Sequence, residues 1–181
     1  MSDLPRVTSI LEAVGLGPDL SMVPEDVLTA AQARGTAVHA AIEAHHYGYL
    51  EEAAITPVIA PYFSAYLKFL AESGHEPIHS EIEVTHPAWR YRGHPDRIGW
   101  LQGHRALFDF KSGAAAGAEY QVAAYIEAWN AEHPSEPITS GFIVPLRSDG
   151  TYRLIEVDLA HATQVWLAAV VVYQARKERT R

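Results

Sequence analysis

The segment from Arg105 to Lys111 reads RALFDFK and has the alternation of a half-buried β-strand. Because residues i and i+2 of a strand lie on the same face, Phe108 and Phe110 share one face with Ala106, whereas Asp109 and Lys111 share the other. Charged side chains are seldom buried without a partner. The segment therefore predicts a central strand that packs on a core with one face and presents an acid and a lysine on the other.

Two extended segments precede this strand, and each offers carboxylates. Residues 78–84 alternate in polarity, which predicts a strand with Glu81 and Glu83 on one face. Residues 91–101 form a second extended stretch that Gly93 and Pro95 interrupt, and this stretch presents Asp96. Carboxylates from three neighbouring strands form a hard-oxygen cluster suited to magnesium or manganese (Mg2+ or Mn2+). The sequence alone does not decide between Glu81 and Glu83.

The alternative interpretation of these acids is a set of surface salt bridges with nearby arginines. For a single carboxylate this alternative is as good as a metal site. It explains less well why Asp96, Asp109 and Lys111 occur together in apolar segments.

The remaining pattern predicts helices before and after the strands. Gly48 and Gly74 are expected to end two of the leading helices. The expected helices are 7–14, 25–47, 57–73, 119–132 and 161–179, and two further strands are 138–146 and 152–157. Gly103 and His104 suit a tight turn before the Asp109 strand. This order predicts an α/β fold in which helices flank a mixed central β-sheet.

The 181 residues fit a single domain with a sizeable core, because 48% of them are hydrophobic. We divide it into a helical N-terminal part (1–75), a sheet core (76–158) and a C-terminal helix (159–181). The absence of cysteine excludes disulfides, zinc–thiolate sites, iron–sulfur clusters and a cysteine nucleophile. The N-terminus lacks a signal-peptide pattern, and no apolar run approaches the ~20 residues that a membrane span needs. We expect a cytoplasmic protein of a bacterial or phage-infected cell, with no membrane partner.

The net charge of −8 does not favour a nucleic-acid partner, but the charges are unevenly distributed. Residues 1–80 carry −7, whereas residues 81–181 hold 11 Lys and Arg against 12 Asp and Glu. If several of those later acids bind metal, the rest of that half is net basic. The composition therefore permits a cationic groove for DNA.

Five motifs in order resemble the PD-(D/E)XK nuclease superfamily, and most closely its RecB-like exonuclease branch, which includes many phage enzymes. They are the helical Arg34-Gly35-x-x-x-His39, the strand Glu81, Gly93-x-x-Asp96, Asp109-x-Lys111-Ser112-Gly113 and the helical Gln121-x-x-x-Tyr125. The resemblance spans residues 34–125, about half of the chain. It implies a restriction-endonuclease-like αβββαβ core, here with extra N-terminal helices. This core agrees with the order of elements read from the sequence.

The resemblance also implies roles for individual residues. Asp96 and Asp109 would be metal ligands, His39 a further ligand, and Glu81 a ligand or the holder of a metal-bound water. Lys111 would position or activate the attacking water and offset charge on the scissile phosphate. Because a lysine among acids stays protonated, we favour the electrostatic role over general-base catalysis. Gln121 and Tyr125, which share a helix face, would orient the site or touch the substrate backbone.

These observations predict a metal-dependent DNA nuclease, and we expect an exonuclease acting on single strands or duplex ends. A structure-specific endonuclease and a catalytically silent nucleic-acid-binding module are alternatives. A non-nuclease metal site at His39, Glu43 and His46, which share one helix face, is a further alternative. Trp89, with nearby arginines, is expected at a hairpin tip that could contact DNA.

Overall fold

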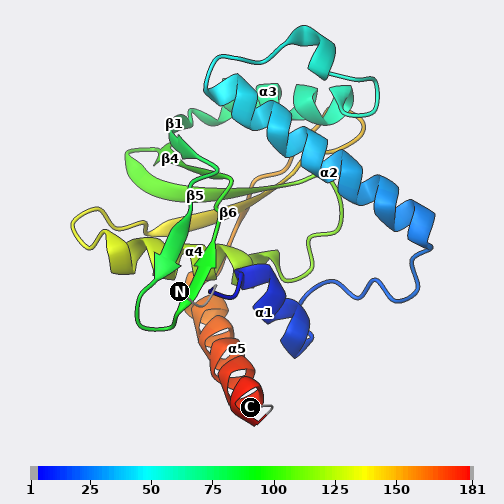
Figure 1. The fold of residues 1–181 in the computed structure, drawn as a ribbon. Helices are drawn as coiled ribbons and strands as arrows, with labels where there is room; N and C mark the ends of the chain where they lie inside the picture. Colours follow the sequence, from blue (N-terminus) through cyan, green and yellow to red (C-terminus); the bar gives the residue numbers. More distant parts are fainter. Residues whose placement is uncertain (1–3, 180–181) are drawn as a thin grey trace.

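The computed structural model describes residues 4–179. Its helices are α1 (Val7–Val14), α2 (Glu25–His46), α3 (Ala60–Ser73), α4 (Ala118–Glu132) and α5 (Leu159–Arg179), with a 3-10 turn, η1 (Glu52–Ala54). The strands are β1 (Glu76–Ser80), β2 (Val84–His86), β3 (Tyr91–Gly93), β4 (Arg97–Leu101), β5 (His104–Lys111), β6 (Ser140–Pro145) and β7 (Ile155–Glu156). Figure 1 shows their arrangement.

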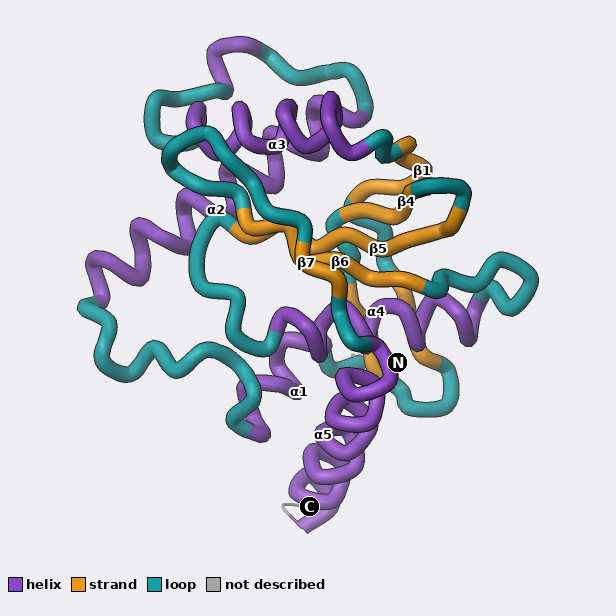
Figure 2. Tube along the Cα trace, turned by 180° about the vertical axis from the view of Figure 1, so that it is seen from behind, coloured by secondary structure: helices purple, strands orange, loops and turns teal. Residues whose placement is uncertain are grey.

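The central sheet has five strands in the order β1-β4-β5-β6-β7. Strands β5 and β6 are parallel, with α4 between them in the chain, and the other pairs are antiparallel. Strands β2 and β3 form a separate two-stranded hairpin. Figure 2 shows the sheet from behind. The predicted α/β fold, with a mixed sheet, flanking helices and extra N-terminal helices, is confirmed.

Helices cover both faces of the sheet, and strand β5 separates two cores. Phe108 and Phe110 pack with α2 and α3, and Leu107 packs with α1, α4 and α5 on the other face. The face that carries Leu107 also carries Asp109 and Lys111, as the alternation predicted. The two charged side chains therefore emerge where β5 meets α4.

Two predicted strands are each interrupted, which corrects the sequence-based boundaries. The expected strand 78–84 ends at Ser80, because Glu81 adopts a left-handed backbone conformation with φ 52°. The chain then leaves the main sheet and enters β2. The expected stretch 91–101 is likewise two strands, β3 and β4, in different sheets. Glu81 therefore lies just after β1, and Asp96 lies just before β4.

Other boundaries differ less from the prediction. A tight turn does precede β5, but it lies one residue earlier than predicted: Gln102 and Gly103 have positive φ, 51° and 80°, and His104 already belongs to β5. Strand β7 is shorter than the predicted 152–157, and Tyr152 makes only an isolated bridge to Leu146. Among residues 4–179, no helix is long and apolar enough to cross a membrane.

Candidate metal centre

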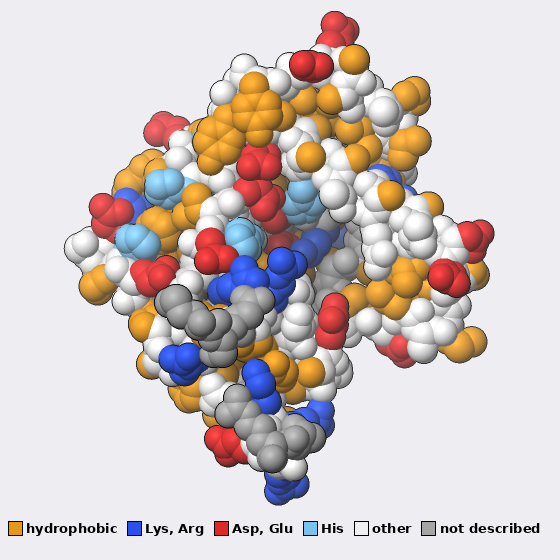
Figure 3. Space-filling view, in the orientation of Figure 1, with side chains coloured by type: hydrophobic (Ala, Val, Ile, Leu, Met, Phe, Trp, Pro, Cys, Tyr) orange, Lys and Arg blue, Asp and Glu red, His pale blue; other side chains and the backbone are white. Residues whose placement is uncertain are grey.

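Three side chains from different elements converge on one point. The Nδ1 atom of His39, on α2, lies 3.3 Å from Glu81 Oε1 and 3.3 Å from Asp96 Oδ1. One ligand atom from each of the three residues lies within 4.8 Å of the other two. Figure 3 shows acidic and histidine side chains gathered beside a hollow that separates α2 from the body of the molecule. We call these three residues the metal group.

Backbone contacts between β1 and the start of β4 fix two members of this group. The amide of Glu81 donates to the carbonyl oxygen of Asp96 at 3.3 Å, and the Ser80 hydroxyl donates to the same carbonyl at 3.1 Å. The Asp96 carboxylate is held by its other oxygen, Oδ2, which accepts a 2.6 Å hydrogen bond from the Phe110 amide. Oδ1 of Asp96 is thus left to face His39.

A chain of polar contacts adjoins the metal group on β5 and α4. Lys111 Nζ donates to Asp109 Oδ1 at 3.0 Å and to Gln121 Oε1 at 3.0 Å. Gln121 Nε2 in turn donates to the Tyr125 hydroxyl at 2.7 Å. Tyr125 thus fixes the Gln121 side chain one turn away on α4, and Gln121 fixes the lysine ammonium. Neither residue belongs to the metal group.

Burial and opposite charges set the protonation of these groups. The Asp96 carboxylate raises the pKa of His39 well above its usual 6.5, and Glu81 adds to this effect against the cost of burial. Burial opposes ionisation of Asp96, but His39 and Lys111 outweigh it and lower its pKa. Burial raises the pKa of Asp109 to about 6. Burial also disfavours the Lys111 ammonium, yet Asp109 and Asp96 keep its pKa above the ordinary value, so the lysine is charged at neutral pH.

The donor set fits a divalent cation. The two carboxylates are hard-oxygen ligands, and the imidazole adds a nitrogen ligand of the kind that transition metals accept. His39 Nδ1 lies 3.3 Å from one oxygen of each carboxylate, so the three ligand atoms are close enough together to bind one cation. Lys111 Nζ lies 2.9 Å from Asp109 Oδ2, but among the described residues this buried oxygen has no hydrogen bond of good geometry. A buried carboxylate oxygen in that state has coordination capacity left.

The structure separates residues that the sequence could not. Glu83 points away from the metal group, since its Oε2 is 2.8 Å from Arg92 NH1 and 3.6 Å from His94 Nε2. Glu81 and Glu83 do not share a strand face, because the backbone turns at Glu81. Among the described residues, the alternative grouping of His39 with Glu43 and His46 is not formed. Asp109 lies beside the metal group, paired with Lys111, and is not one of its three members.

Two contributions were not anticipated from the sequence. The Phe110 amide orients Asp96, and no side-chain pattern signals a backbone donor. Arg34 NH2 donates to the Ser112 carbonyl at 3.2 Å and so ties α2 to the loop after β5. The neighbouring Gly35 is not tightly packed, because a Cβ there would meet only Ser112 Oγ at 3.8 Å.

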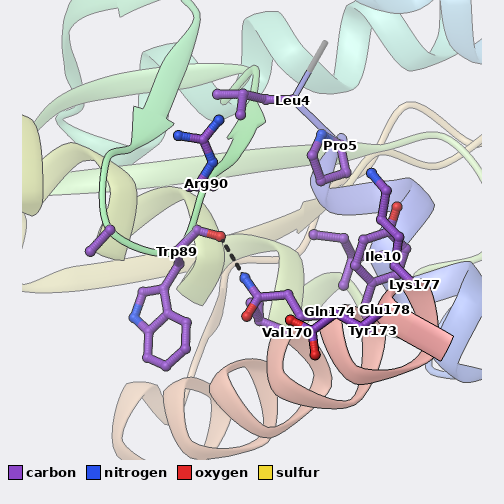
Figure 4. Close-up of a pocket in the computed structure, with 11 residues that line it drawn as sticks. Leu4, Pro5, Ile10, Trp89, Arg90, Val170, Tyr173, Gln174, Lys177 and Glu178 are labelled. Carbon is purple, nitrogen blue, oxygen red and sulfur yellow. Dashed lines mark hydrogen bonds between the residues drawn. The ribbon is translucent and has the colours of Figure 1, made fainter. Parts of the chain in front are cut away.

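A second hollow lies between the β2–β3 hairpin, the segment before α1 and α5 (Figure 4). Its volume is about 510 Å³, and it is not lined by the metal group. Trp89 lies at the hairpin tip, as predicted, and its carbonyl accepts a 3.0 Å hydrogen bond from Gln174 of α5. Arg90 and Lys177 lie on opposite sides of the hollow in Figure 4. This region therefore brings basic and aromatic side chains together.

Comparisons with known proteins bear on the fold. No family model matches the sequence, and no curated protein matches it. The chain superposes on the crystal structure of a candidate exonuclease from Eubacterium rectale with a TM-score of 0.57 and 14% sequence identity, covering 94% of this chain and 72% of that one. A weaker similarity, with a TM-score of 0.44 and 16% identity, is to the alkaline exonuclease of Laribacter hongkongensis in complex with dAMP, covering 98% of this chain and 89% of that one. The first similarity shows a shared fold.

Proposed function

We propose that this protein is a divalent-metal-dependent deoxyribonuclease that hydrolyses phosphodiester bonds from strand ends. The observation that carries the proposal is the placement of the metal group next to Asp109 and Lys111. The metal group supplies an imidazole and two carboxylates. The Asp109 carboxylate, one oxygen of which lacks a hydrogen bond of good geometry, lies beside this group and pairs with the protonated Lys111. A phosphodiester is anionic, and its hydrolysis requires both cationic compensation and an activated water.

His39, Glu81 and Asp96 would hold Mg2+ or Mn2+, with Asp109 as a further ligand through its second oxygen. A bound divalent cation supplies water of lowered pKa and neutralises charge on the phosphate oxygens. The protein's own residues then orient the reaction. The Phe110 amide keeps Asp96 aimed at the site, and Asp109 holds Lys111.

Lys111 would act as a fixed positive charge. Its raised pKa keeps it protonated, so it does not accept a proton from water at neutral pH. It would instead orient the attacking water and stabilise the negative charge that develops on the phosphate. Gln121 and Tyr125 are positioning residues in this scheme, because Gln121 contacts the lysine and Tyr125 holds Gln121.

The superfamily resemblance and the geometry agree. The five motifs of the PD-(D/E)XK pattern are spread over residues 34–125. Each of them supplies residues that line or support the same site. The shared fold with the Eubacterium rectale protein is consistent with this assignment. We propose the RecB-like branch, a proposal supported by His39, which lies on a helix that precedes the sheet and joins the two carboxylates.

DNA is the proposed substrate because cationic side chains line hollows at the hairpin side of the molecule. Arg90 and Lys177 line the larger hollow, and Arg6 lines a neighbouring one. Cationic side chains on a nucleic-acid-binding surface provide sequence-independent contacts to the phosphate backbone. Trp89 adds an aromatic face at the same place.

The decisive experiment is degradation of end-labelled single- and double-stranded DNA, linear and circular, in Mg2+, Mn2+ or EDTA. We expect metal-dependent loss of linear DNA that Asp109→Ala, Lys111→Ala and Glu81→Ala each abolish. Glu83→Ala is the matched control, because this nearby carboxylate lies outside the metal group, and it should retain activity.

Other outcomes would change the assignment in defined ways. Cutting of circular DNA would indicate an endonuclease. DNA binding without cutting of any substrate would indicate a silent binding module and overturn the proposed activity. Equal activity of Glu81→Ala and the wild type would show that Glu81 is not a metal ligand and would refute the proposed metal group.

A further inference from the structure

Two exposed tyrosines lie at the carboxyl end of α2, the helix that carries His39. Tyr47 caps the helix and Tyr49 comes two residues later, and they are 53% and 61% exposed. Their rings are parallel to within 4°, with centroids 6.3 Å apart. We call this pair the tyrosine platform. Figure 3 shows hydrophobic side chains at the carboxyl end of α2, next to the acidic and histidine side chains of the site.

The tyrosine platform is fixed to the metal group through one residue. The Tyr47 hydroxyl donates to the Ser80 carbonyl at 3.0 Å, and Ser80 immediately precedes Glu81. The same serine holds Asp96 through its side chain. The His46 ring meets Tyr47 edge-on, with centroids 4.7 Å apart. The platform thus has a set position relative to the proposed scissile phosphate.

The charge around the platform selects the kind of group that could bind there. The sequence has no lysine or arginine between Arg34 and Lys68, whereas Glu51 and Glu52 follow Tyr49 after one intervening residue. Phosphate groups would be repelled from this surface. An uncharged planar ring would not, and parallel aromatic faces in water are the usual platform for unstacked bases. The cationic side chains that could hold phosphates lie instead at the hairpin side of the molecule.

We propose that Tyr47 and Tyr49 stack on an unpaired base of the DNA strand whose phosphodiester lies at the metal group. The inference rests on the proposed nuclease function and deepens it, because it specifies a substrate with an unpaired end. A base inside a duplex is stacked on both faces, and the base at a blunt end is held by its pairing partner, so turning either onto the platform first requires unpairing or unstacking. The protein should therefore bind and degrade single-stranded or frayed ends in preference to blunt duplex ends.

The test is oligonucleotide binding by fluorescence anisotropy with Mg2+, using the Asp109→Asn chain so that the DNA is not cut. The probes are a labelled single-stranded oligonucleotide, the same oligonucleotide with each nucleotide in turn made abasic, and a blunt duplex. We expect Tyr49→Ala to weaken single-strand binding about tenfold, within the range for loss of one stacked base, and to leave duplex binding unchanged. Tyr49→Trp should restore the affinity, because it restores an aromatic face.

The abasic series separates stacking from a structural effect. One or two abasic positions should weaken binding by the Tyr49-containing chain, and the same positions should have no effect in Tyr49→Ala. Trp100→Ala, which removes an exposed aromatic ring at the opposite end of β4, is the control and should bind like its parent. An equal thermal midpoint for Tyr49→Ala would show that the fold is intact.

Two results would overturn the proposal, and they differ from failure of the nuclease function. If Tyr49→Ala binds every probe as well as its parent, the platform does not contact DNA, although the wild-type chain still cuts it. If no abasic position matters, the bound bases are not stacked on the tyrosines. If the parent chain binds no DNA and the wild type cuts none, the proposed function and this inference both fail.

Discussion

The ring of Tyr125 lies directly against the backbone of Gly93, so closely that a Cβ atom at position 93 would stand 2.1 Å from Cε1 of the tyrosine. Tyr125 is buried, and its hydroxyl accepts the hydrogen bond from Gln121 that continues to Lys111. The glycine of the Gly-x-x-Asp motif is therefore explained by packing against the helix that positions the lysine.

Gly93→Ala should consequently destabilise the protein and misplace the lysine. The added methyl group must displace a buried ring, and such overpacking costs about 1–3 kcal/mol. Urea denaturation measures the loss, and nuclease assays at a temperature where the variant is folded should show reduced activity. Gly35→Ala is the matched control: its nearest neighbour is 3.8 Å away, and an alanine within α2 should stabilise it by up to about 1 kcal/mol. Equal stability of Gly93→Ala and the wild type would contradict the packing described.

Gln121→Leu should slow catalysis without weakening metal binding. The substitution removes one acceptor from the Lys111 ammonium, which is then free to move away from the reacting phosphate. A misplacement of this kind reduces the rate by roughly 10- to 100-fold. Single-turnover cleavage and a separate Mn2+ titration measure the two effects. Asn130→Ala is the control on the same helix, because that amide bonds the backbone of Ile138 away from the site. A parallel loss of metal affinity in Gln121→Leu would show that the glutamine belongs to the metal site.

Divalent cations should stabilise the protein in the absence of DNA. A ligand that binds only the folded state adds about 2.7 kcal/mol at a hundredfold excess over its dissociation constant. Thermal unfolding with and without Mn2+ should therefore show a higher midpoint with the metal. Asp96→Ala should abolish the shift, because it removes a ligand of the metal group. Glu83→Ala should still show the increase in the unfolding midpoint with Mn2+. If Asp96→Ala shows the same increase, the metal binds at a different site.

His75 should make stability depend on pH below neutrality. Burial, with the Arg97 charge, lowers the pKa of its imidazole from 6.5 to about 4. Between these values the unfolded chain holds a proton that the folded chain does not, so stability falls as the pH falls. The loss from this group alone should reach about 3 kcal/mol near pH 4.

Denaturation of wild type and His75→Gln from pH 7.5 to 4 tests this. The variant has no titratable group at position 75 and should lose less stability over the same range. His104→Gln, which replaces an exposed histidine, should follow the wild type. Identical pH profiles for His75→Gln and the wild type would mean that His75 is not the group responsible.

The sequence alone determined the main features of β5 and its surroundings. Alternation in Arg105 to Lys111 assigned the two phenylalanines to one face, which α2 and α3 cover in the structure, and Asp109 with Lys111 to the opposite face. Such alternation is a local property of extended backbone, so no tertiary information was needed. The single-domain division and the roles of the site residues stay predictions.

Tertiary structure alone decided which glutamate joins the site and how Asp109 is used. Glu81 reaches His39 because its amide pairs with the Asp96 carbonyl and its backbone turns to φ 52°, a conformation that the pattern of residues 78–84 does not reveal. Lys111 pairs with Asp109, its neighbour on the same strand face, and α4 brings Gln121 to the same ammonium as a further acceptor. These outcomes depend on contacts between segments that lie far apart in the chain. Local sequence fixes which face a side chain takes, but partners from other elements fix what it touches.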